Sequence, residues 1–186
     1  MLVFQVEMPF MGTYTQEDYA QQMIDEYIEM GVKPKDVWPQ SFNPEDVYYW
    51  VDNTDFGKQA VALDGVYGRT EAEVEEFVDE LVDRGVHIVA PPMWRLVEYD
   101  ADSELQISPS HYAMYANGSG LDIITWTLER TDPGLTGWYW QTVNTGLSPM
   151  EGDKYSLLYV LAFQVEVLGV FSDWPATTTF FANCLL

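Results

Sequence analysis

Cysteine, basic residues and long apolar runs are all scarce in this sequence of 186 residues. Cys184 is the single cysteine, which excludes an internal disulfide framework and a zinc site built from several cysteines. Lysine and arginine total 8 against 30 aspartate and glutamate residues, so the formal net charge is −22. Because this charge repels nucleic acid and anionic membranes, we expect neither as a partner.

The apolar runs are also too short for a membrane span, so we expect none. The first five residues lack the basic start and the long apolar centre of a signal peptide. Residues 2–6 instead read as the tail of a strand, which predicts a truncated chain. The acidic residues are spread along the predicted helices as a solvated surface, and for the full-length form we favour a periplasmic or secreted location.

The sequence contains helix signals at regular intervals. Thr15 with Asp18 and Thr70 with Glu73 have the capping-box spacing, and apolar residues recur at helical spacing after each pair. Five helices are predicted, over about 16–30, 44–50, 71–84, 109–117 and 154–168. The segment 130–153 lacks such a pattern, and a loop of this length is more often functional than idle.

Short β-branched or apolar runs alternate with these helices and predict five strands, over 36–42, 59–64, 86–90, 121–127 and 170–173. Strict alternation of strand and helix implies an α/β domain over 1–186 with a parallel sheet and right-handed crossovers. Pro39 weakens the first strand and predicts a bend there. Two closures stay open, a doubly wound sheet and a barrel sector. No glycine-rich phosphate loop supports a nucleotide-binding version of the former.

Four segments taken in order, 37–42, 59–64, 123–129 and 169–175, resemble the glycerophosphodiester phosphodiesterase family. The similarity runs from about Met8 to the C-terminus. It implies a TIM barrel that hydrolyses glycerophosphodiesters to glycerol 3-phosphate and an alcohol, usually with bound Ca²⁺ or Mg²⁺. The five predicted strands then correspond to barrel strands four to eight, so we expect a partial TIM barrel, the C-terminal portion of the fold.

The same resemblance places the family's reactive groups on its first three strands. A His-Arg motif, a Glu-x-Asp pair with a later His, and a Glu-x-Lys segment supply the acid, the base, the metal ligands and a phosphate contact. Glu7 is the only candidate for the third-strand carboxylate, but Met8 and Pro9 follow it where a lysine belongs. We therefore expect no catalytic residue, no metal bound by this chain, and negligible phosphodiesterase activity.

Polar and aromatic residues at the carboxyl ends of the predicted strands are the candidate substrate-binding groups, since parallel α/β proteins bind ligands at that edge. We select four: Trp126, Phe42, Gln40 and Ser41. The resemblance assigns Trp126 to the glycerol side of the pocket, and Phe42 adds apolar wall. Gln40 and Ser41 either bind substrate or satisfy local backbone groups. Trp94 and Trp138 are further candidates for the wall.

Three carboxylates, Asp64, Glu129 and Asp173, also end predicted strands. Together they could bind a hard cation, although for each of them we favour a structural role in a turn or a helix cap. His87 begins a strand and His111 begins a helix, and we expect both to be ordinary structural histidines.

Two other functions stay open beside the phosphodiesterase resemblance. One is a non-catalytic module that binds a polyol or phosphate ligand at Trp126. The other is an unrelated acidic metal-dependent hydrolase that uses the three carboxylates. A half-open barrel would also leave strand edges unpaired, which predicts self-association.

Overall fold

The computed structural model describes residues 3–4, 12–128 and 152–185. Six strands form one sheet in the order β1-β2-β3-β4-β7-β8, and every neighbouring pair is parallel. The strands are β1 (Val3–Phe4), β2 (Gln40–Ser41), β3 (Val61–Leu63), β4 (Ile88–Ala90), β7 (Asp122–Thr125) and β8 (Gly169–Val170). The α/β class with parallel strands and flanking helices is confirmed.

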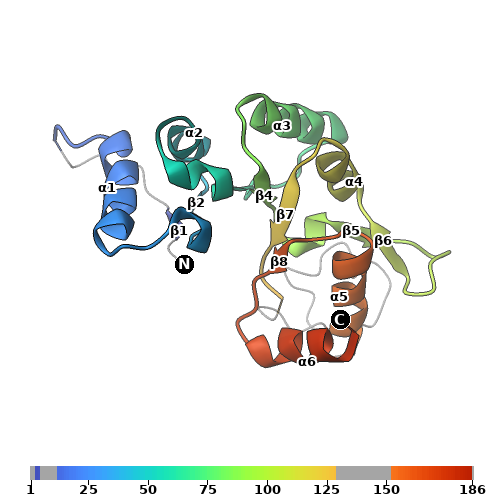
Figure 1. Ribbon diagram of the computed structural model, residues 1–186. Helices are drawn as coiled ribbons and strands as arrows, with labels where there is room; N and C mark the ends of the chain where they lie inside the picture. Colours follow the sequence, from blue (N-terminus) through green and yellow to red (C-terminus); the bar gives the residue numbers. More distant parts are fainter. Residues whose placement is uncertain (1–2, 5–11, 129–151, 186) are drawn as a thin grey trace.

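The helices are α1 (Gln16–Glu29), α2 (Pro44–Asn53), α3 (Glu71–Asp83), α4 (His111–Gly118), α5 (Asp153–Phe163) and α6 (Pro175–Leu185). Figure 1 shows α1, α2, α3 and α4 following one another along one side of the sheet, with α5 and α6 together near β8. Both predicted capping boxes are present, at Thr15 with Asp18 and at Thr70 with Glu73. In each box two backbone N–H groups that would otherwise lack a partner are satisfied, which is why these helices begin where the sequence predicted.

Side chains from alternate positions of the strands pack on opposite faces of the sheet. Ala62, Val89 and Ile123 belong to the main core, which also holds buried residues of the helices. A second, smaller cluster contains the neighbouring positions Val61, Leu63, Ile88 and Ala90, with Phe42, Ile124 and Trp126 packed against it. The strands β3, β4 and β7 are therefore apolar on both faces, as in buried parallel sheets.

The observed strands are shorter than the predicted ones, and β5 (Val97–Tyr99), β6 (Ile107–Pro109) and α6 were missed. Residues 34–36 form a 3₁₀ helix and β2 starts just after Pro39, which has no N–H to donate to a sheet. The hairpin of β5 and β6 was not predicted, and neither was α6. In the described ranges the sheet is open, with β1 and β8 at its two edges.

The same ranges contain no helix with both the length and the apolar character that crossing a bilayer requires.

Candidate ligand-binding cleft

A cleft of about 820 Å³ lies at the carboxyl ends of β2 and β3, bordered by α2 and α3. Ser41 and Phe42 come from the end of β2, and Asp64 and Gly65 from the turn after β3. Trp126, which follows β7, completes this edge. The sequence predicted that Ser41, Phe42 and Trp126 would lie at this end of the sheet, and the structure brings all three to one cleft.

Trp126 and Phe42 form an aromatic wall of the cleft. Their ring centroids are 5.8 Å apart and the planes make an angle of 85°, the favourable edge-to-face arrangement. The indole Nε1 donates to the carbonyl of Ala90 at 2.8 Å, which fixes the indole and commits its only N–H. A Cβ on Gly65 would lie 2.9 Å from Phe42, so glycine is what permits the phenyl ring to lie there. The wall is thus rigid and can contact a ligand only through apolar surface.

Ser41 lines the cleft but uses its hydroxyl within the protein. It donates to Asp46 at 2.7 Å and accepts from the backbone N–H of Asn43 at 3.0 Å. Asp46 also accepts from the amide of Gln16, at 2.9 and 3.1 Å. Of the two roles considered for Ser41, the local one is observed. Gln40 is 1% exposed and does not line the cleft, and within the described part of the chain its Nε2 has no hydrogen-bond partner.

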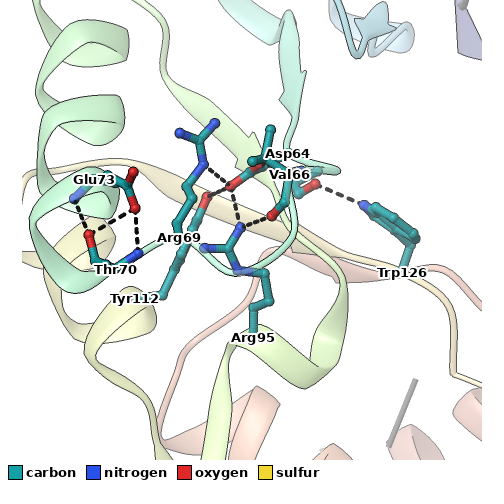
Figure 2. A network of polar contacts seen from close by, with 9 residues as sticks. Asp64, Val66, Arg69, Thr70, Glu73, Arg95, Tyr112 and Trp126 are labelled. Carbon is teal, nitrogen blue, oxygen red and sulfur yellow. Dashed lines mark hydrogen bonds and ion pairs between the residues drawn. The ribbon is translucent and has the colours of Figure 1, made fainter. Parts of the chain in front are cut away.

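Asp64 is the centre of a buried polar network at the end of β3 (Figure 2). Its carboxylate is 2.8 Å from Arg95 Nη1, accepts from the Tyr112 hydroxyl at 3.2 Å, and accepts from the N–H of Val66 at 3.0 Å. Arg95 Nη1 also donates to the Val66 carbonyl at 2.9 Å. These bonds hold the turn at residues 64–66 in place. Burial, and next the charge of Asp64, raises the pKa of Tyr112 well above 10, so its phenol stays protonated and donates its hydrogen bond to Asp64 even in mildly alkaline solution.

Arg69 is a second guanidinium beside the same carboxylate. Its Nε lies 3.5 Å from Asp64 Oδ2, and its guanidinium carbon is 4.4 Å from the centroid of the Phe77 ring. The side chain is 19% exposed and belongs to the cleft lining. Nε makes no hydrogen bond to the described residues, so its contact with Asp64 is an ion pair only. Two guanidiniums therefore share one carboxylate.

The α3 side of the cleft is acidic and carries Glu73, Glu76 and Glu80. Glu73 accepts from the Thr70 N–H at 2.7 Å and from the Thr70 hydroxyl at 2.8 Å, and these bonds lower the pKa of Glu73. Glu80 accepts from the hydroxyl of Tyr48 at 3.0 Å. Two of the three carboxylates are thus already engaged in stabilising α3 and its contact with α2.

No known family model matches the sequence. Among curated proteins, it is 38% identical over 188 residues to the "Extracellular protein" of Arthroderma benhamiae (strain ATCC MYA-4681 / CBS 112371), spanning 97% of this chain and 76% of that protein. The chain belongs to the family of this fungal protein. The name of this relative gives a location and no reaction.

The other predicted residues lie away from the cleft or outside the described residues. His87 is exposed just before β4, at the opposite end of the strand, and His111 begins α4 with Nε2 3.1 Å from Glu75. Trp94 packs on Tyr67, with ring centroids 5.0 Å apart, and does not line the cleft. Three predicted residues fall outside the described ranges: Glu7, Glu129 and Trp138.

The described residues do not fit the Ca²⁺ or Mg²⁺ that the family resemblance implies. The Asp64 carboxylate is engaged by Arg95, Arg69 and Tyr112, so a cation would have to displace two guanidiniums. Asp173 is exposed after β8, and in the described ranges no three potential ligand side chains form a cluster. The hydrogen bond from the Val66 N–H matches the turn role favoured for Asp64.

Sequence reasoning missed Arg69, Arg95 and Tyr112. A weak signal was present, because Lys and Arg total only 8 in the chain and these two arginines follow the carboxyl ends of β3 and β4 within a few residues. A cation in such a loop of a parallel sheet lies near the ligand edge. That both meet Asp64 depends on the tertiary structure.

Proposed function

We propose that this chain carries the ligand-binding part of a glycerophosphodiester phosphodiesterase-like protein and that its cleft binds a glycerophosphodiester. The observation that supports this most is the position of Trp126. Its fixed indole and the Phe42 ring form an apolar wall at the carboxyl edge of the sheet, where the resemblance expects the glycerol side of a pocket.

The dimensions and chemistry of the cleft support a small ligand that is both apolar and polar. Its volume of about 820 Å³ is within the usual range for small-molecule sites. The C–H groups of glycerol can pack on the rings of Trp126 and Phe42. The polar lining on the other side, which includes Arg69 and Glu76, can bind charged or hydroxyl groups.

We also infer that the protein is secreted. The relative in Arthroderma benhamiae is called extracellular, and the net charge of −22 suits a solvated surface in a salt-rich medium. Self-association through the edge strands β1 and β8 stays a prediction, and light scattering would measure it.

Calorimetry with glycerol 3-phosphate tests the pocket. We expect Trp126→Ala to weaken binding about tenfold, the loss of roughly 1.4 kcal/mol of contact. Trp94→Ala is the matched control, because Trp94 packs on Tyr67 outside the cleft, and it should leave the affinity within about twofold. Equal affinities of the parent and Trp126→Ala would exclude the proposed pocket.

A hydrolysis assay tests the assignment of the reaction. We expect negligible turnover of glycerophosphocholine by this chain with Ca²⁺ or Mg²⁺, since neither His87 nor His111 lines the cleft and Asp64 is engaged in ion pairs. Robust turnover would show that the reactive groups were placed wrongly.

The second candidate is a binding module for polyols without hydrolysis, and the ion-paired state of Asp64 favours it over a metal-dependent hydrolase. Competition separates it from the leading proposal. If glycerol and sugar alcohols displace glycerol 3-phosphate at similar concentrations, the polyol module is supported. If only phosphate esters compete, the phosphodiester pocket is supported. Loss of metal binding after replacing Asp64, Glu129 and Asp173 together would revive the metal-dependent hydrolase.

A further inference from the structure

The charges around Asp64 are unequal, and the surplus lies on Arg69. Arg95 makes the close ion pair with Asp64 at 2.8 Å and is 7% exposed, whereas Arg69 Nε is at 3.5 Å without a hydrogen bond to the described residues. One carboxylate has one negative charge, so the Arg95 pair already balances it. The Arg69 guanidinium adds a positive charge to the cleft that this pair does not require.

Two contacts hold Arg69 in a defined orientation. Its guanidinium lies over the Phe77 ring at 4.4 Å, and its Nε faces Asp64. Figure 2 shows its two terminal amino groups directed away from Asp64. A guanidinium presents a planar pair of N–H donors that matches the oxygens of a phosphate, and holding it in place reduces the entropy lost on binding.

Among the described residues, no glutamate of the cleft wall forms a close ion pair with Arg69, although the charge of Arg69 contributes to lowering the pKa of Glu73. Glu73 is bonded to Thr70 and Glu80 to Tyr48. Their hydrogen-bond partners are neutral groups, so both carboxylates keep their charge, but neither lies within ion-pair distance of Arg69 in the described structure. Because Arg69 is 19% exposed at the cleft wall, a ligand can reach it, while its partial burial reduces screening by salt.

We propose that Arg69 binds the phosphate group of the ligand in this cleft through its terminal amino groups. Asp64 and Phe77 act as positioning residues, since they orient the guanidinium without touching the ligand phosphate themselves. The choice of a phosphate ester rests on the proposed function, whereas binding of an oxyanion by Arg69 does not.

Calorimetry on the 186-residue chain with glycerol 3-phosphate and with inorganic phosphate tests this inference. Arg69→Gln should lower the affinity for both probes by about tenfold, since a bidentate charged contact is lost. Lys35→Gln is the control: it removes one positive charge from an exposed side chain of the 3₁₀ helix at residues 34–36, which does not line the cleft, and should change the affinity by about twofold at most. Arg69→Lys, which keeps the charge without the planar fork, should lose about threefold.

Unchanged affinity in Arg69→Gln, or no binding of either phosphate probe by the parent chain, overturns the inference. If Arg69→Gln does not fold, Arg69→Lys decides, and parental affinity in that variant overturns it too. The comparison with Trp126→Ala separates the two proposals. Loss with Arg69→Gln alone supports the phosphate contact and contradicts the glycerol pocket, whereas loss with Trp126→Ala alone does the reverse.

Discussion

Two buried aspartates follow neighbouring strands of the sheet, and the protein stabilises their negative charges in different ways. Asp46, in the first turn of α2, is 2% exposed, and among the residues that the structure describes its carboxylate accepts hydrogen bonds from neutral groups of Gln16, Ser41 and Asn43 alone. Asp64, after β3, is 1% exposed and is bonded by the cation of Arg95 and by a phenol. Both carboxylates lie close to the cleft, but only the second brings cations to it.

The difference follows from where each carboxylate lies. Asp46 is at the N-terminus of a helix, where the peptide dipoles stabilise a negative charge and neutral donors complete the site. Asp64 lies in a turn without this support, so its burial requires a cation. Asp46 therefore braces α2 against β2 and α1, whereas Asp64 links the turn after β3 to α4 and leaves Arg69 available in the cleft.

The largest effect is expected for Asp64→Ala, with a loss of about 3–5 kcal/mol in the free energy of unfolding, because Arg95 would be left buried without its counter-ion. Urea denaturation would measure it. The double variant Asp64→Ala with Arg95→Met should recover part of the lost stability, since it also removes the buried guanidinium that has no counter-ion. A loss below about 1 kcal/mol in the single variant would contradict the role of this ion pair.

A smaller effect is expected for Asp46→Ala. It should lower the free energy of unfolding by about 2 kcal/mol, because the hydroxyl of Ser41 and the amide of Gln16 lose a hydrogen-bond acceptor but no buried charge is left without a counter-ion. The same urea experiment provides the comparison. If Asp46→Ala lowers the free energy of unfolding as much as Asp64→Ala does, the two carboxylates would not differ in the way proposed, one stabilised by a helix dipole and neutral donors and the other by an ion pair.

The smallest effect is expected for Tyr112→Phe, at about 1.5 kcal/mol, because the hydrogen bond to the Asp64 carboxylate is lost while the ring is kept. Burial raises the pKa of Tyr112, so folding keeps the phenol protonated while the unfolded chain ionises near pH 10. Stability should therefore be intact below about pH 10 and fall as the pH rises above it.

Tyr112→Phe should make that alkaline decline shallower without abolishing it, since burial also raises the pKa of Tyr48. Thermal unfolding of both proteins between pH 8 and 11.5 would show the difference. Parallel pH profiles would mean that Tyr112 is not protected from ionisation in the folded protein.

Local signals predicted the helices of this protein well. The boxes at Thr15 and Thr70 are satisfied by residues three positions away, so their bonds can be inferred from spacing alone. The hairpin of β5 and β6 was missed because its strands have three residues each and pair across a turn without a marked signal. Helix α6 was missed because the last predicted strand, 170–173, was followed by Trp174 and Pro175 and no helix was assigned after them, although Pro175 is the first residue of α6.

For the candidate site, too, the sequence predicted the position of some residues but not their contacts. The alternation of strand and helix placed Phe42 and Trp126 at one edge of the sheet, because parallel strands share a carboxyl end. It could not show that the Ser41 hydroxyl would be taken by Asp46, or that Gln40 would lie outside the cleft.

The sequence by itself determined the α/β class, the acidic surface and the aromatic residues at the carboxyl edge, because periodicity, charge and capping depend on neighbours a few positions apart. The tertiary structure decided which cation meets which carboxylate. Asp64 is 31 residues from Arg95 and 48 from Tyr112, and only the packing of η3 (Met93–Arg95) and α4 beside the end of β3 brings them together. Contacts over such separations depend on the whole fold, and no local pattern specifies them.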